Sequence, residues 1–117
     1  MKKIKENYLD GEKLFRKYFE MGEVASSVRL AGFAKTEGMI PPTGKNPTPM
    51  GVWKAMWRWA SMKENKMVAF QIFSEYIDKY DWKLPDTDLP WKGDRQELWH
   101  KFMLQKIKSA WQFPKQS

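Results

Sequence analysis

Thr48-Pro-Met-Gly-Val-Trp-Lys-Ala-Met-Trp-Arg-Trp-Ala60 is the stretch of sequence that decides the fold. Thr48 is a favourable helix N-cap, and Pro49 suits the first helical position, where its missing N–H leaves no hydrogen bond unmade. Apolar side chains then recur at positions 53, 56, 57 and 60, the spacing of one helical face. The stretch therefore predicts an amphipathic helix with one face in a hydrophobic core.

The rest of the chain predicts further helices. The expected segments are Asp10 to Gly22, Glu23 to Ala31 with Gly32 as its stop, Lys66 to Tyr80 after an Asn65 cap, and 94–111 starting at a capping-box-like Asp94. No segment shows the alternation of apolar and polar residues that is typical of a strand. The sequence therefore predicts an all-α single domain of about five helices, with 1–9 as a flexible leader and 81–93 as a Pro/Asp linker.

Composition excludes several classes of protein. The chain has 117 residues, 42% of them hydrophobic, which is enough for one domain with its own core. It has no Cys, so neither a disulfide framework nor a thiolate site is expected. No stretch approaches the ~18 consecutive apolar residues that a membrane span needs. We therefore expect a cytoplasmic, or otherwise intracellular, protein with no membrane partner.

The distribution of charge points to an anionic partner. The formal net charge is +7, and the stretch from Gly38 to Lys63 contains no Asp or Glu. A cationic loop that leads into an N-capped helix is well suited to binding a polyanion, because freed N–H groups and basic side chains face the same way. The residues expected to contact nucleic acid are Lys45, Asn46, Thr48, Lys54, Arg58 and Lys63. DNA is the expected partner, and RNA is a variant of the same hypothesis.

Residues 23–61 resemble the helix-turn-helix class of DNA-binding proteins in their general arrangement. The residues that carry the resemblance are Ala25, Val28 and Gly32 in the first helix and Thr48, Pro49, Trp53 and Trp57 in the second. The connection over 33–48 is longer than the usual turn of three to four residues. The resemblance implies a regulator, with a role in transcription regulation, or a recruitment subunit, and it implies that the 48–61 helix enters the major groove.

A protein-interaction module, such as an adaptor or inhibitor, is the alternative function. Exposed aromatic side chains are frequent anchors at protein interfaces. The expected partner-binding residues are Trp59, Trp82, Trp91 and Trp111. The acidic section from Glu75 to Asp94 and the basic surfaces would then steer association. Contact of the last helix with a membrane surface is a further alternative.

Signs of catalysis are weak. His100 is the only histidine, and a single His without Cys does not make an ordinary zinc site. Asp81, Asp86 and Asp88 lack the spacing of a calcium-binding loop. Thr43-Gly44-Lys45 lacks the full phosphate-loop pattern. We therefore expect no enzymatic activity, no catalytic residue, no metal and no cofactor.

Overall fold

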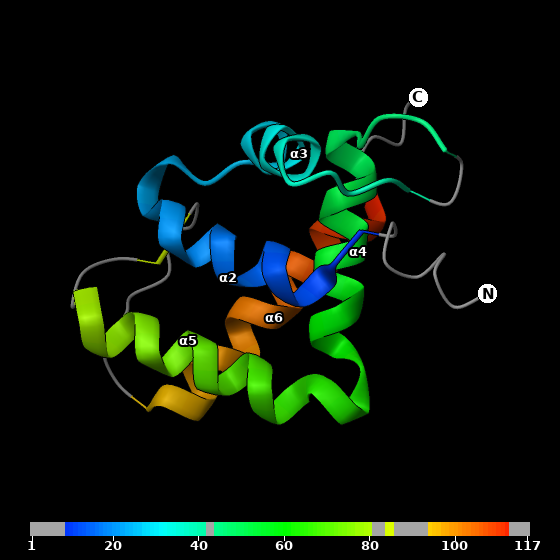
Figure 1. Ribbon diagram of the computed structural model, residues 1–117. Coiled ribbons are helices and arrows are strands. Elements are labelled where there is room, and N and C mark those ends of the chain that lie inside the picture. Colours follow the sequence, from blue (N-terminus) through cyan, green and yellow to red (C-terminus); the bar gives the residue numbers. More distant parts are fainter. Residues whose placement is uncertain (1–8, 42–43, 81–83, 86–93, 113–117) are drawn as a thin grey trace.

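Helix α4, Pro49–Ser61, lies at the centre of the fold (Figure 1). The computed structural model describes residues 9–41, 44–80, 84–85 and 94–112 of the chain. The other α-helices are α2 (Gly11–Met21), α3 (Ser27–Thr36), α5 (Lys66–Tyr80) and α6 (Arg95–Gln112), and each of them contacts α4. Two short 3₁₀ turns, Gly22–Val24 and Lys63–Asn65, precede α3 and α5.

The predicted all-α class is confirmed, and the described residues form five α-helices in one globule. Within the described ranges there is no strand. None of the helices found there is both long enough and apolar enough to cross a membrane. The segments 1–8 and 86–93, which hold nearly all of the expected leader and most of the expected linker, lie outside the described residues.

Helix α4 begins as its sequence predicts. Thr48 has an extended backbone, and its Oγ1 accepts a hydrogen bond from the N–H of Gly51 at 3.0 Å. Pro49 occupies the first helical position. The buried residues of this helix are Val52, Trp53, Met56, Trp57 and Ala60. The expected apolar face is therefore confirmed, with Val52 as an addition.

Helix α2 also follows its sequence signals. The side chain of Asp10 accepts a hydrogen bond from the backbone N–H of Lys13 at 3.1 Å. The helix ends at Gly22, whose φ of 60° lies in the region that favours glycine. The expected start and stop are both confirmed.

The expected second helix is wrong in its bounds. A 3₁₀ turn occupies Gly22–Val24, and α3 starts after Ser26, whose Oγ accepts from the N–H of Arg29 at 3.2 Å. Gly32 does not stop α3, because it lies on an exposed face where nothing approaches within 4 Å of an added Cβ. The helix ends instead at Thr36, before Gly38 with a φ of 78°.

This shift changes which side chains of α3 are buried. Val28 is 68% exposed, and Val24 in the preceding 3₁₀ turn is 54% exposed. Leu30, Ala31 and Ala34 are buried in their place. The connection to α4 is correspondingly shorter than 33–48, because α3 continues into the expected loop.

Polar side chains at the starts of α5 and α6 cap a helix or contact a neighbouring one. The side-chain amide of Asn65 donates to the carbonyl of Trp59 at 2.9 Å, which joins the start of α5 to the end of α4. Asp94 Oδ1 accepts from the N–H of Gln96 at 2.9 Å, so the expected cap of α6 is confirmed. Arg95 of α6 pairs with Asp78 of α5 at 3.0 Å.

Aromatic rings from four helices make the core. The ring of Tyr18 on α2 lies 5.2 Å from that of Trp57 on α4, with the planes nearly perpendicular. Phe102 on α6 lies 5.8 Å from Trp57 and 5.5 Å from Phe73 on α5. The Tyr18–Trp57 and Phe102–Trp57 pairs are edge-to-face, and such pairs add about 0.5–1.5 kcal/mol each beyond the burial of their surface. The core therefore joins α2, α4, α5 and α6 through large, rigid side chains.

A lysine belongs to this core. Lys106 on α6 is only 5% exposed, and its ammonium lies 5.8 Å from the ring centroids of Tyr18, Trp53 and Phe102. A cation at this distance from an aromatic face is attracted by the ring quadrupole. Lys106 therefore contributes to the packing of the core.

Candidate nucleic-acid interface

A cavity of about 750 Å³ opens along the outer face of α4. We call it the α4 recess. It is lined by Leu9, Gly11, Pro41, Lys45, Asn46, Thr48, Gly51, Lys54, Ala55, Arg58, Trp59 and Met62. These residues come from α4 and its C-cap, from the start of α2 and from the loop before α4.

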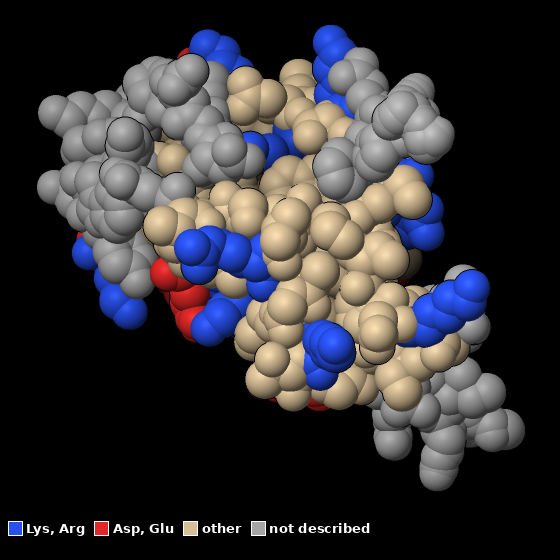
Figure 2. Space-filling view, turned by 90° about the horizontal axis from the view of Figure 1, so that it is seen from above, with Lys and Arg blue, Asp and Glu red and all other residues tan. Residues whose placement is uncertain are grey.

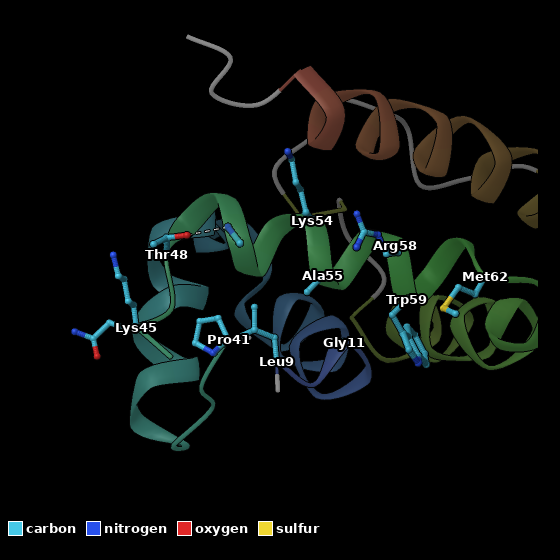
Figure 3. A pocket seen from close by; sticks show the side chains of 12 residues that line it. Leu9, Gly11, Pro41, Lys45, Thr48, Lys54, Ala55, Arg58, Trp59 and Met62 are labelled. Atoms are coloured by element: carbon cyan, nitrogen blue, oxygen red, sulfur yellow. Dashed lines mark hydrogen bonds between the residues drawn. The ribbon is translucent and has the colours of Figure 1, made fainter. Parts of the chain in front are cut away.

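The α4 recess has a cationic edge and an apolar edge (Figure 3). Lys54 and Arg58 project from one side of α4, and Lys45 stands beyond the start of the helix. On the other side lie Leu9 and Pro41. Lys54 and Arg58 are therefore separated from Leu9 and Pro41 by α4, whereas Lys45 lies on the side of Pro41.

Small residues on α4 leave the space for this hollow. Gly51 and Ala55 line it, one helical turn apart, where larger side chains would fill it. At the nearby contact with α2, a Cβ added to Gly11 would lie 2.3 Å from the Cβ of Trp59. The backbone of α2 therefore touches α4 beside the recess and sets the position of the apolar edge.

The α4 recess gathers five of the six residues that the sequence predicts for nucleic-acid contact. They are Lys45, Asn46, Thr48, Lys54 and Arg58. Lys63, the sixth, is exposed in the 3₁₀ turn after α4 and is not among the lining residues. No Asp or Glu is found among the described residues that line the recess, so the charged side chains in that set are all positive.

The residues predicted to contact nucleic acid differ in their hydrogen bonding and in their exposure. The Thr48 hydroxyl accepts from the N–H of Gly51, so this side chain first serves the start of α4. Arg58 and Lys45 are exposed, and Lys54 is half-buried. The three cations therefore differ in exposure, with more of Arg58 and Lys45 than of Lys54 open to solvent.

Of the four tryptophans proposed for partner contact, Trp59 is the one whose side chain the structure describes. It is half-buried, lines the α4 recess and lies 5.5 Å from the ring of Phe15. Trp82 and Trp91 lie outside the described residues, as does the side chain of Trp111. The expectation of partial exposure for Trp59 is confirmed.

Sequence reasoning missed the apolar edge of the site. Leu9 belongs to the expected leader, and Pro41 to the expected 33–48 connection. Both lie in the recess because α2 and the end of the loop converge on α4. Leu9 precedes the Asp10 cap directly, the position at which a hydrophobic residue often packs beside a helix start, and this was the available signal.

The face that α3 occupies does not carry a concentrated positive patch. Figure 2 shows Lys and Arg side chains spread around a broad area of uncharged residues, with few Asp or Glu side chains in view. Exposed apolar side chains such as Val28 belong to this part of the chain. On this face, the cations are therefore dispersed rather than gathered.

A second groove lies between α5 and α6, with a volume of about 810 Å³. We call it the α5–α6 groove. Its lining includes Met67 and Leu104, which are 81% and 70% exposed. Its charges are mixed, because Lys66 and Lys101 are accompanied by Asp94 and Glu97. The α5–α6 groove therefore offers apolar surface without a single sign of charge.

Neither groove holds a set of metal ligands. Within the described part of the chain there is no group of three or more His, Cys, Asp or Glu side chains placed to bind a metal ion.

No protein-family model, no curated protein sequence and no solved structure matches this chain. The chemistry of the α4 recess is therefore the basis for assigning a function.

Proposed function

We propose that this protein binds DNA through the α4 recess and has a binding role rather than a catalytic one. The proposal is supported by one observation above all. Lys45, Lys54 and Arg58, singled out from an acid-free stretch of sequence, line one cavity among whose described residues there is no carboxylate. Three cations around a common hollow attract a chain of phosphates more strongly than the same cations dispersed over a surface.

The roles of the side chains follow from their chemistry. Arg58 is suited to a bidentate contact with a phosphate or with guanine, because its guanidinium presents several donors in one plane. Lys45 and Lys54 act as point charges for neighbouring phosphates. Asn46 and Thr48 supply short polar groups at the start of α4. A helix-turn-helix-like arrangement of α3 and α4 remains part of this proposal, with the loop before α4 in place of a tight turn.

Salt dependence gives the direct test. Each lysine or arginine that neutralises a phosphate adds about 0.7–0.9 to the slope of log affinity against log salt. Three such contacts predict about 20- to 40-fold weaker binding when salt rises from about 50 to about 200 mM. In the Lys45→Ala/Lys54→Ala double variant, one contact remains, and we expect only about threefold weakening over the same range.

Lys63→Ala is the matched control, because Lys63 belongs to the same acid-free stretch but does not line the α4 recess. Fluorescence anisotropy with a labelled duplex and a labelled single strand gives both slopes. Lys63→Ala is expected to keep the wild-type slope. No binding to either nucleic acid at low salt, or an unchanged slope in the double variant, would refute DNA binding at this site.

The α5–α6 groove supports a second candidate function, the docking of a protein partner. Met67 and Leu104 are large apolar side chains that lie open to solvent on adjacent helices. Apolar side chains exposed together often mark an interaction surface. If the groove serves this purpose, Met67→Lys should abolish the interaction while DNA binding is retained. A Met67→Lys variant that loses DNA binding but keeps its fold would contradict this division of roles.

A further inference from the structure

We propose that the α4 recess takes an unpaired base, so that single-stranded nucleic acid is its preferred ligand. This inference rests on the proposed nucleic-acid binding and specifies its ligand. The inference concerns the apolar edge of the α4 recess, which includes Leu9, Pro41 and Trp59 and has no role in binding phosphates. A ligand that only presented phosphates would leave this edge unused.

The separation of the two edges matches the layout of a single strand. An unpaired nucleotide carries its phosphate on one side of the sugar and a flat, largely apolar base on the other. With phosphates beside Lys54 and Arg58, the base is directed across α4 toward Leu9 and Trp59 (Figure 3). Aromatic and apolar side chains bind the faces of unpaired bases without regard to sequence.

The size of the cavity agrees with such a ligand. Its volume of about 750 Å³ lies within the range of about 300–1,000 Å³ that is usual for small-molecule sites. Gly51 and Ala55 have no side chain or a small one, so the part of the recess that they line has room for a planar group. In a duplex, the bases are paired and stacked inside, so a duplex offers this hollow only its phosphates and base edges.

The floor residues also argue against major-groove reading by the middle of α4. A recognition helix reads bases with side chains that project from it. Here Gly51 and Ala55 project little or nothing, and Leu9 of the α2 start lies alongside them. The entry of a base into the recess beside α4 is therefore favoured over the insertion of this part of α4 into a DNA groove.

The test compares three fluorescein-labelled probes by anisotropy with the wild-type chain. They are an oligothymidylate of about 15 nucleotides, an abasic strand with the same number of phosphates, and a duplex of equal length; this length spans the usual site sizes. We expect the abasic strand to bind at least about fivefold more weakly than the oligothymidylate, since a stacked base accounts for that much or more. The duplex is expected to bind no more tightly than the abasic strand.

The outcomes separate this inference from the proposed function. If none of the three probes binds at low salt, DNA binding itself fails. If the abasic strand binds as tightly as the oligothymidylate, or the duplex binds more tightly than both, nucleic-acid binding holds and the single-strand inference is overturned. An oligouridylate of the same length shows whether DNA or RNA is the better strand, and preference of either over its abasic counterpart supports the inference.

Two variants locate the base. Ala55→Leu fills the floor of the α4 recess, and Leu9→Ala removes part of its apolar edge. Each is expected to reduce the affinity for the oligothymidylate to that for the abasic strand, with the salt slope unchanged. Leu104→Ala removes an exposed leucine outside the recess and is the matched control. If both recess variants fold, as shown by circular dichroism, and both bind the oligothymidylate as the control does, the base is not held there.

Discussion

Gly11 and Trp59 bring α2 and α4 into direct contact at the edge of the α4 recess. A Cβ added to Gly11 would lie 2.3 Å from the Cβ of Trp59 and 3.0 Å from the carbonyl oxygen of Ala55. Both neighbours belong to, or are fixed directly on, the backbone of α4, so neither can move aside as the end of a flexible side chain would. The absence of a side chain at Gly11 is therefore what permits this close approach of the two helices.

Gly11→Ala is predicted to destabilise the protein. The added methyl forces α2 away from α4, and overpacking of this kind is expected to lower the free energy of unfolding by about 1–3 kcal/mol. Thermal denaturation followed by circular dichroism measures the change. Because Gly11 also lines the α4 recess, affinity for the oligothymidylate should fall as well. An unchanged melting temperature would show that the helices separate at no cost.

Gly32→Ala is the matched control and has the opposite predicted sign. Nothing lies within 4 Å of a Cβ added to Gly32, which is an exposed residue inside α3. Replacing a helical glycine by alanine reduces the entropy of the unfolded chain and is expected to stabilise by about 0.4–1 kcal/mol. The same denaturation experiment tests it. A loss of stability would mean that α3 is not a regular helix at this position.

Substitutions at Thr48 are predicted to separate the folding role of this residue from its position in the site. Thr48→Ala removes the cap on the N–H of Gly51 and should lower stability by about 1 kcal/mol. Thr48→Asp keeps a capping oxygen but places a negative charge in the α4 recess. We expect Thr48→Asp to keep the wild-type melting temperature and to bind nucleic acid more weakly. Equal affinity of Thr48→Asp and wild type at low salt would place the phosphates elsewhere.

Tyr18→Phe is predicted to lower stability although the ring is retained. The Tyr18 hydroxyl is buried and donates to the carbonyl of Pro85 at 3.1 Å, which attaches this part of the chain to the core. Removing the donor leaves a buried carbonyl without its partner, which is expected to destabilise by about 1–3 kcal/mol. Urea denaturation measures this difference. The nucleic-acid affinity of Tyr18→Phe should equal that of the wild type, because Tyr18 does not line the α4 recess.

Lys106 is predicted to resist chemical modification in the native protein. Its ammonium lies among three aromatic rings and the residue is 5% exposed, whereas Lys108 on the same helix is exposed. Brief acetylation with an amine-reactive ester, read by peptide mass spectrometry, should modify Lys108 well before Lys106. In urea the two should react alike. Equal acetylation rates of Lys106 and Lys108 in the native protein would show that the three rings do not shield the Lys106 ammonium.

Local signals in the sequence account for much of the helical structure. Thr48 and Pro49 define the start of α4 through contacts within one turn, so no knowledge of the tertiary structure was needed. The same holds for Asp10 and for Gly22 of α2. The prediction for α3 was wrong because two start signals compete there: Ser26 caps the helix, and the residues before it form a 3₁₀ turn. Pattern alone did not decide between them.

The candidate site was predicted in part. Its cations are neighbours in the sequence and lie on or beside one helix, so their convergence could be expected from Lys45, Lys54 and Arg58 alone. The apolar edge depends on how closely α2 approaches α4, which the Gly11–Trp59 contact determines. Lys106 carried a signal that was not used, because it falls between Phe102 and Ala110 at a spacing of four residues, on the buried line of α6.

The central position of α4 has a consequence for how a ligand is received. Since α2, α3, α5 and α6 all rest on it, its amide hydrogens are expected to exchange with solvent only when the entire molecule opens. The surface that it offers is then already formed before any encounter takes place. A ligand need not organise this helix, and its association should show the small entropy penalty of a rigid receptor.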